Sequence, residues 1–201
     1  MSITYIGRFK SDSMTYNLKS VFYLGIENEY AAGAWDSKDS IQPLDISAYV
    51  DPIAKGRTRG QGLAIYRVHH ALSKPDGCPI GATETASMGM ALSVKPYTTT
   101  GDLLSGQIAY GDLSPSSDLV IQADQFMGTA SGGTGSTNGV LVRTCEPSDE
   151  VPYVAVRDTI FAIMSGDETA AAEIFSTYRL ECAMITLDTA TLNQLLRTQT
   201  A

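Results

Sequence analysis

Ionic side chains are scarce in this sequence. It contains 6 Lys and 8 Glu among 201 residues, against 19 Ser and 20 Thr. Lys and Glu usually cover exposed helix faces, so a helical bundle is disfavoured and β-structure is favoured. Hydrophobic residues make up 43% and charged residues 18% of the chain. The chain therefore lacks the low hydrophobicity and high charge that are typical of disorder, and it has enough apolar side chains for a packed core.

Signals for membranes and secretion are also missing. The sequence has no window of 18 apolar residues and no Asn-x-Ser/Thr acceptor, and its first ten residues lack the apolar run of a signal peptide. Its three cysteines, Cys78, Cys145 and Cys182, have no CxxC spacing. We therefore expect free thiols made in a reducing compartment, with one disulfide and one spare thiol as the alternative.

Positive charge is sparse as well. The net charge is -8, which repels phosphate and disfavours a dedicated nucleic-acid-binding domain. The one basic cluster comprises Lys55, Arg57 and Arg59. It follows a predicted strand and precedes another, so we expect a loop that contacts an anion or an acidic partner, or else faces solvent.

The usual catalytic signatures are absent. No Gly-x-Ser-x-Gly motif occurs, and the glycine-rich segment 131–136 lacks the Lys of a phosphate-binding loop. His69 and His70 are the only histidines. Adjacent strand residues point to opposite faces, so these two rings are not expected to share a metal or form a dyad. Glu27 and Glu29 are interpreted as a solvated strand face. We predict no catalytic residue, no metal ligand and no cofactor.

Alternation with a period of two dominates the chain and predicts strands. The expected strands cover 20–30, 44–50, 62–72, 86–94, 106–110, 118–126, 139–144, 153–164 and 177–187. In 62–72, one face is expected to carry Ala64, Tyr66, Val68 and Leu72. In 177–187, one face is expected to carry Tyr178, Leu180, Cys182 and Met184.

Helix signals are few. Residues 167–173, which begin with acidic side chains, are expected to form one or two turns of helix. Residues 188–197 predict a terminal helix capped by Asp188, with a stripe of Leu192, Leu195 and Leu196. This stripe has two possible partners, the chain's own sandwich or a neighbouring subunit.

Many short strands and little helix predict an all-β fold, an antiparallel sandwich of eight to nine strands with a short C-terminal helix. The long connections 31–41, 74–85 and 125–139 favour a single jelly roll over a plain meander. The expected organisation is an N-terminal lead segment over 1–19, a jelly-roll domain over 20–187, and a short helix or tail over 188–201.

About eight alternating strands with long end loops, closed by the segments 154–164 and 178–187, resemble the single jelly-roll capsid proteins of icosahedral viruses. The resemblance implies a structural capsid subunit without enzymatic activity, which self-assembles through low-charge lateral surfaces. Its implied partners are copies of itself and other capsid proteins. Its implied location is the virion, after synthesis in the host cytoplasm.

One departure from that family concerns the basic N-terminal arm that many small-virus coat proteins carry. Residues 1–20 hold only Arg8, Lys10 and Lys19 against Asp12. The resemblance then points to a shell that touches the genome little, either one that encloses an internal virion membrane or one in which this chain is a minor or outer component.

Other functions remain open at this stage. The first is a carbohydrate-binding or adhesive sandwich, for which Tyr30, Trp35, Tyr49 and Tyr97 could form an aromatic platform. The others are an accessory spike or tail protein and a sandwich enzyme.

Overall fold

The computed structural model describes residues 21–31, 40–51, 59–73, 86–96, 117–130, 137–166 and 173–200. These segments contain nine strands and one helix. The strands are β1 (Phe22–Tyr30), β2 (Ser40–Asp45), β3 (Arg59–Ser73), β4 (Ala86–Ser93), β5 (Val120–Ala130), β6 (Thr137–Cys145), β7 (Tyr153–Ala155), β8 (Thr159–Gly166) and β9 (Ile174–Asp188), and the helix is α1 (Thr189–Thr200). No helix in these segments is long and apolar enough to cross a membrane.

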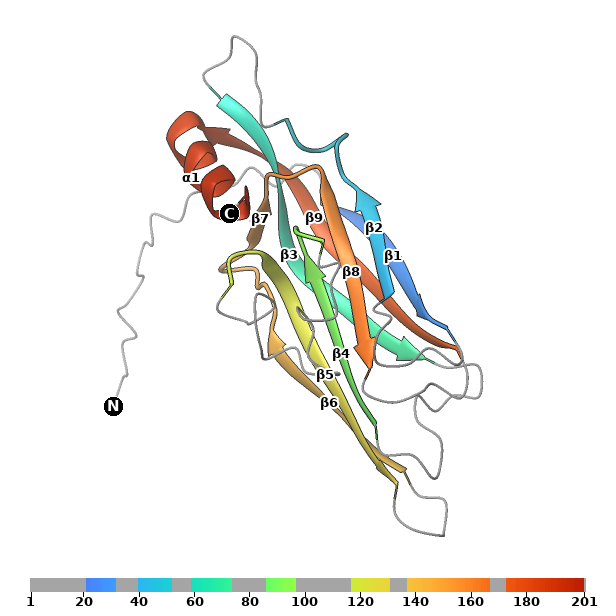
Figure 1. Ribbon diagram of the computed structural model, residues 1–201. Helices are drawn as coiled ribbons and strands as arrows, with labels where there is room; N and C mark the ends of the chain where they lie inside the picture. Colours follow the sequence, from blue (N-terminus) through green and yellow to red (C-terminus); the bar gives the residue numbers. More distant parts are fainter. Residues whose placement is uncertain are drawn as a thin grey trace, which may run out of the picture.

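The strands form two facing sheets, shown in Figure 1. One sheet has four strands in the order β1-β9-β3-β7, and the other has five in the order β2-β8-β4-β5-β6. Every pairing between these strands is antiparallel. The chain changes sheet at each connection except the two that join β4, β5 and β6. This order is that of a jelly roll, with β6 added as an extra edge strand, so the predicted fold class is confirmed.

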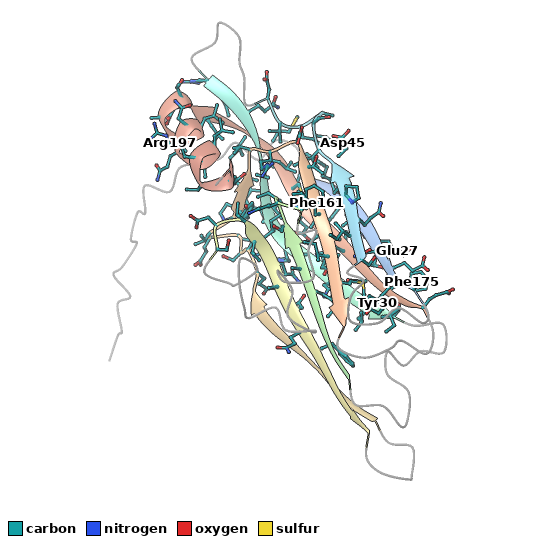
Figure 2. All side chains as sticks on the ribbon, viewed as in Figure 1. Glu27, Tyr30, Asp45, Phe161, Phe175 and Arg197 are labelled. Carbon is teal, nitrogen blue, oxygen red and sulfur yellow. The ribbon has the colours of Figure 1, made fainter. Side chains whose placement is uncertain are left out.

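Side chains from both sheets fill the space between them (Figure 2). Leu63 and Ile65 of β3 meet Leu92 of β4 and Ile160 of β8, all with no exposed surface. Cys182 of β9 lies in the same cluster as a free thiol. Burial, followed by the charge of the neighbouring Glu181, raises the pKa of this thiol to about 12. The side chains of Cys78 and Cys145 lie outside the described residues.

Several predicted strands are confirmed with shifted ends, namely those at 20–30, 62–72, 86–94, 118–126, 139–144 and 177–187. The predicted strand at 44–50 is wrong: β2 lies earlier, and residues 47–49 form a turn. There the Ser47 amide donates to Asp45 Oδ1 at 2.8 Å and ends the strand. The predicted strand at 106–110 and most of the 167–173 turn lie outside the described residues.

The single predicted strand over 153–164 is also wrong. It consists of β7 in the four-stranded sheet and β8 in the five-stranded sheet. Arg157 and Asp158 form a bend between them, where the chain passes from one sheet to the other. The apolar residues on both sides of this bend form one continuous pattern, because each strand buries its side chains in the same core.

A bulge in β3 overturns the face predicted for residues 62–72. The register between β3 and β9 shifts between Ile65 and Arg67, which makes Tyr66 an extra residue. Ala64 and Tyr66 therefore belong to the cluster on the outer face of the four-stranded sheet, away from the other sheet. Val68 belongs to the core between the sheets. The bulge moves the apolar positions from one face to the other midway along the strand.

The helix α1 covers part of this outer face, as Figure 1 shows. Leu192 is buried, and Leu195 and Leu196 are partly buried against the same cluster. Gly60 lies beneath Leu192, where a Cβ would overlap the leucine side chain. The helix therefore rests on a strand surface that lacks a side chain at this point.

Polar contacts at both ends hold α1 in place. At its start, the Thr191 amide donates to Asp188 Oδ1 at 2.8 Å, which confirms the predicted cap. Near its end, the buried Gln199 side chain bridges to the β7 region. Its Oε1 accepts from the Val156 amide at 3.0 Å, and its Nε2 donates to the Val154 carbonyl at 2.7 Å.

Along β9, Met184 departs from its predicted burial. By strand alternation it belongs to the same face as Tyr178, Leu180 and Cys182, but its side chain is 46% exposed. Ala183, Ile185 and Leu187 on the other face are buried there by the cluster that includes Leu192 of α1. The buried face of β9 therefore changes where the helix replaces the opposite sheet as the covering layer.

Candidate functional site

The two adjacent histidines of β3 lie on opposite faces, as the strand pleat predicts. The His69 side chain is half exposed on the outer face, and its Nε2 lies 2.9 Å from Glu181 Oε1. The His70 side chain has no exposed surface and points between the sheets. The predicted placement of the two rings on opposite faces is therefore confirmed.

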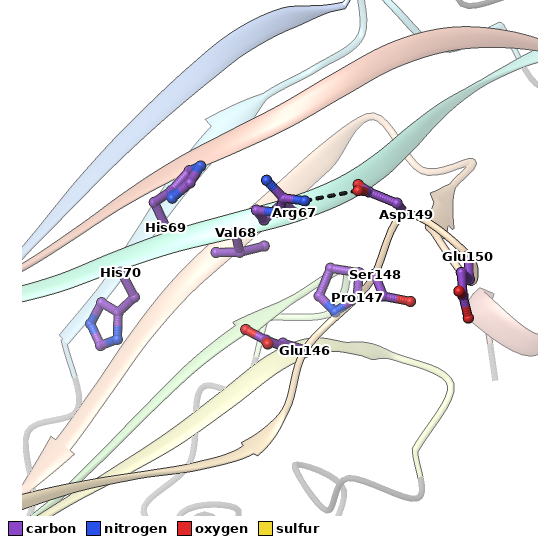
Figure 3. Close-up of a pocket in the computed structure, with 9 residues that line it drawn as sticks. All are labelled: Arg67, Val68, His69, His70, Glu146, Pro147, Ser148, Asp149 and Glu150. Carbon is purple, nitrogen blue, oxygen red and sulfur yellow. Dashed lines mark hydrogen bonds and ion pairs between the residues drawn. The ribbon is translucent and has the colours of Figure 1, made fainter.

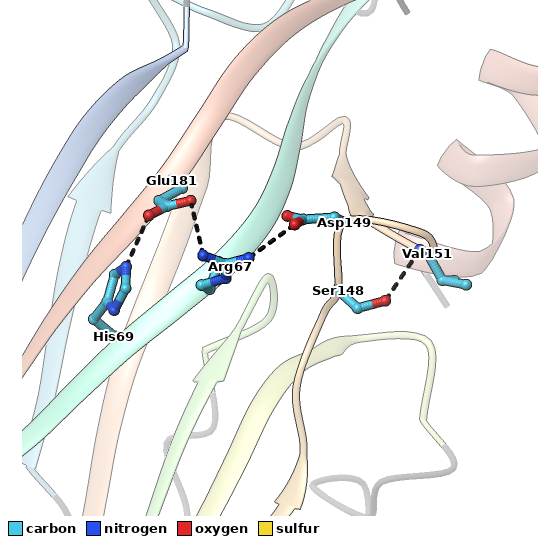
Figure 4. A network of polar contacts seen from close by, with 6 residues as sticks. All are labelled: Arg67, His69, Ser148, Asp149, Val151 and Glu181. Atoms are coloured by element: carbon cyan, nitrogen blue, oxygen red, sulfur yellow. Dashed lines mark hydrogen bonds and ion pairs between the residues drawn. The ribbon is translucent and has the colours of Figure 1, made fainter. Parts of the chain in front are cut away.

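On the outer face, His69 belongs to a small charged network shown in Figure 4. Arg67 lies 2.8 Å from Asp149 Oδ2 and 3.9 Å from Glu181 Oε2. The pKa of Glu181 is lowered, first by the hydrogen bond with His69 and also by the charges of Arg67 and His69, although partial burial opposes this. The network joins β3 and β9 to the segment before β7.

On the inner face, His70 is the centre of a buried polar network, here called the His70 network. Its Nδ1 lies 2.7 Å from Asp124 Oδ2, and its Nε2 lies 2.8 Å from Ser176 Oγ. Gln122 Nε2 donates to the same Asp124 oxygen at 2.5 Å. The imidazole stacks on the Tyr178 ring with 4.3 Å between centroids and 9° between planes.

The order of carboxylate, imidazole and hydroxyl in this network is that of a serine hydrolase triad. A nucleophile must reach its substrate, however, and Ser176, His70 and Asp124 all have fully buried side chains. Their enclosure between the sheets supports a structural role. His70 and Ser176 belong to the four-stranded sheet and Asp124 to the five-stranded sheet, so the network ties the two sheets together.

Sequence reasoning missed the His70 network. Its members are separated by 54 and 106 positions along the chain, and no local motif connects them. One signal was present: Gln122 and Asp124 stand two residues apart, on the same face of the strand predicted at 118–126. Polar residues at buried strand positions require partners, which the opposite sheet supplies here.

A groove of about 530 Å³ lies beside β3, and Figure 3 shows its lining residues. Here it is called the edge groove. One wall is formed by the consecutive residues Arg67, Val68, His69 and His70, and the other by residues 146–150. That second wall carries three carboxylates, Glu146, Asp149 and Glu150. With Arg67 as the one arginine or lysine among the described residues of the lining, these carboxylates favour a positively charged ligand.

The predicted anion contact is only partly described. Lys55 and Arg57 lie outside the described residues, and Arg59 is an exposed residue at the start of β3, in register with Asp188 of β9. The role of all three remains a prediction. Leu192, Leu195 and Leu196 dock on the chain's own sheet. A contact of the partly buried Leu195 and Leu196 with a second subunit also remains a prediction.

Two of the four aromatic residues considered for a carbohydrate platform, Tyr30 and Tyr49, are buried or partly buried. Tyr30 is only 1% exposed, and Tyr49 is partly buried and stacks on Phe22 with 4.9 Å between centroids. Trp35 and Tyr97 lie outside the described residues. Glu27 and Glu29 are exposed on β1, as expected for a solvated face.

No protein-family model and no curated protein matches this chain. Among solved structures, it is similar to polyomavirus VP1 capsid proteins. The unassembled pentamer of KI polyomavirus VP1 is 10% identical, with a TM-score of 0.42 over 84% of this chain and 95% of that chain. Merkel cell polyomavirus VP1 in complex with disialyllactose is 8% identical, with a TM-score of 0.41 over 85% and 96%.

The apo structure of New Jersey polyomavirus VP1 is 7% identical, with a TM-score of 0.41 over 84% of this chain and 100% of that chain. At these identities the likeness concerns the fold alone, and the jelly-roll assignment rests on the strand order given above. That strand order agrees with the jelly roll that the expected resemblance implied.

Proposed function

We propose that this chain is a structural subunit of an icosahedral virion shell that self-associates through lateral surfaces of low charge. Fold alone does not establish a function, so the proposal needs a surface suited to assembly. The observation that carries it is the position of the exposed apolar side chains. Val21 and Tyr23, at and next to β1, are 50% and 52% exposed, and Val151, before β7, is 74% exposed.

These side chains lie at opposite edges of one sheet, because β1 and β7 are the outermost strands of the four-stranded sheet. Two different surfaces at opposite edges favour a head-to-tail contact between copies. Such contacts form rings or closed shells when the rotation between copies closes. Interfaces also tend to be poor in Lys and Glu, and this chain has few of either.

Sedimentation velocity and negative-stain microscopy of the full chain test the proposal. The wild-type chain is expected to form rings or closed particles. Val151→Glu and Tyr23→Glu are each expected to leave a monomer with an almost unchanged melting temperature, because both side chains are half exposed or more. The control is Asn193→Glu on the exposed side of α1, which is expected to assemble normally. A wild-type chain that stays monomeric at high concentration would refute the proposal.

The remaining parts of the proposal follow from this role. The subunit is not an enzyme, its partners are its own copies and other capsid proteins, and its location is the virion after synthesis in the host cytoplasm. The net charge of -8 supports a shell that binds its genome little, and the proposal places this shell beside an internal membrane. Residues 1–19 form a lead segment before the jelly roll at 20–187, and residues 188–201 form the terminal unit.

A further inference from the structure

The edge groove follows the backbone of β3 rather than one face of the sheet. Arg67 and His69 point to the outer face, whereas Val68 and His70 point inward. All four nevertheless line the same groove. Only the lateral edge of a strand is next to both sets of side chains, so the groove lies where a neighbouring strand would run.

That neighbouring position is occupied over only a short stretch of β3. The three residues of β7 pair with Leu63, Ala64 and Ile65. Among the described segments, none pairs with Arg67–Ser73 on this side. As far as the described segments go, seven residues of strand edge, about 23 Å at roughly 3.3 Å per residue, are therefore left for an added strand.

The charge of the edge groove favours a cationic strand. Glu146, Asp149 and Glu150 face it, and Arg67 already pairs with Asp149 at 2.8 Å. Glu150 and Asp149 are exposed, so a basic side chain can approach them without first losing all of its hydration.

Residues 1–20 of this chain have the chemistry that the groove requires. Ile3, Tyr5 and Phe9 stand at alternating positions, and apart from Ile6 the residues between them are polar or small, a pattern typical of a strand. Arg8 and Lys10 flank Phe9. The segment has three basic residues and one acidic residue. We infer that residues 1–20 of a second copy add a strand beside Arg67–Ser73, with Arg8 and Lys10 against the carboxylates of 146–150.

The register of the four-stranded sheet favours a second copy as the source. Phe22 and Ile65 both pair with Cys182, so β1 begins level with Ile65 of β3. β1 runs parallel to β3, since both are antiparallel to β9. The first residue of β1, Phe22, therefore lies level with Ile65 and far from Ser73 at the end of β3. The edge β1 is also separated from the edge groove by two strands. A neighbour whose β1 edge meets this β7 edge, as in the proposed assembly on which this inference rests, presents its residues 1–20 directly to the groove.

Isotope-mixed cross-linking tests the inference on the full chain. A photo-reactive amino acid replaces Phe9 in ¹⁵N-labelled protein, which is mixed with unlabelled protein and irradiated. The expected products join position 9 of a labelled chain to residues 67–73 or 146–150 of an unlabelled chain. Products within one labelled chain only would overturn the inference, because the segment would then dock on its own molecule.

Charge reversal gives a second, independent measurement. Arg8→Glu with Lys10→Glu, and separately Glu146→Lys with Glu150→Lys, are each expected to weaken self-association at least about tenfold. Mixing the two double variants is expected to restore association, because the opposite charges then meet again. Asp158→Lys with Glu173→Lys is the matched control, since both are exposed acidic residues outside β1, β7 and the edge groove. It is expected to change association much less than the groove variant.

The outcomes separate this inference from the proposed function. If the wild-type chain forms particles but neither cross-links to the groove nor responds to charge reversal, the inference fails and the shell function stands. If the wild-type chain stays monomeric and gives no cross-links between chains, both fail. Mixed-isotope cross-links together with rescue by the complementary variants support both.

Discussion

The buried His70 network places a carboxylate and an imidazole where water cannot solvate them. Asp124 is fully buried, and its Oδ2 lies 2.7 Å from His70 Nδ1 and accepts a hydrogen bond from Gln122 Nε2 at 2.5 Å. Desolvation of a carboxylate is costly unless such partners are present. Each partner of Asp124 is therefore worth more to stability than a similar contact at the surface.

At this residue scale we predict that His70→Ala lowers the free energy of unfolding by about 3–5 kcal/mol, because it removes the imidazole that pairs with a buried carboxylate. Urea denaturation followed by circular dichroism measures the change. The matched control is His69→Ala, one position along the strand, where the side chain is 51% exposed. A small effect there is expected, since exposed ion pairs contribute little. Equal effects at both positions would contradict the structural role of the network.

At the element scale, the start of α1 depends on ionised Asp188. The hydrogen bond from the Thr191 amide, followed by that from its hydroxyl, lowers the pKa of Asp188 below the ordinary value of an aspartate. A carboxyl group whose pKa is lower in the folded than in the unfolded chain stabilises the folded state at pH values above the unfolded pKa. This contribution is lost as the pH falls through the folded pKa.

We therefore predict that Asp188→Ala lowers the melting temperature at pH 7, and that the difference from wild type narrows below about pH 4, where the aspartate of the unfolded chain becomes protonated. Asp188→Asn is the control, because it retains a capping side chain without the charge. Thermal unfolding between pH 2 and pH 7 measures all three proteins. A wild-type advantage over the alanine variant that grows on acidification would contradict the assignment.

The contact between α1 and β3 is the second feature at this scale. Gly60→Ala places a methyl group against Leu192, and overpacking of this kind costs about 1–3 kcal/mol. We expect α1 to separate from the sheet, with faster proteolysis after Asp188 and a lower melting temperature. Gly25→Ala on β1 is the control, since its added Cβ would meet only the Tyr178 carbonyl at 3.9 Å. Equal proteolysis of both variants would show that α1 does not depend on this glycine.

For the whole molecule, the net charge of -8 predicts weak binding to nucleic acid. We expect no sub-micromolar affinity for double- or single-stranded DNA at 0.15 M salt, because repulsion of phosphates opposes association. Fluorescence anisotropy with labelled oligonucleotides measures it. A tight, salt-dependent complex would contradict this prediction and direct attention to Lys55, Arg57 and Arg59.

Local patterns determined a large part of the fold. Alternation along 86–94 and 177–187 predicted strands because a pleated strand buries every second side chain. Asp188 and the leucines of the last segment predicted a capped amphipathic helix, because both signals lie within a few residues of each other. The scarcity of Lys and Glu, with frequent Ser and Thr, already pointed away from helices.

Only the tertiary structure decided the features that depend on distant partners. The bulge at Tyr66 arises from pairing with β9, and it reverses the face of β3. The division of 153–164 between two sheets depends on which strands lie opposite. The His70 network joins residues from β3, β5 and β9, and the edge groove exists because β7 covers only three residues of β3. Local periodicity predicts none of these features, because each depends on the pairing and packing of strands that are far apart in the chain.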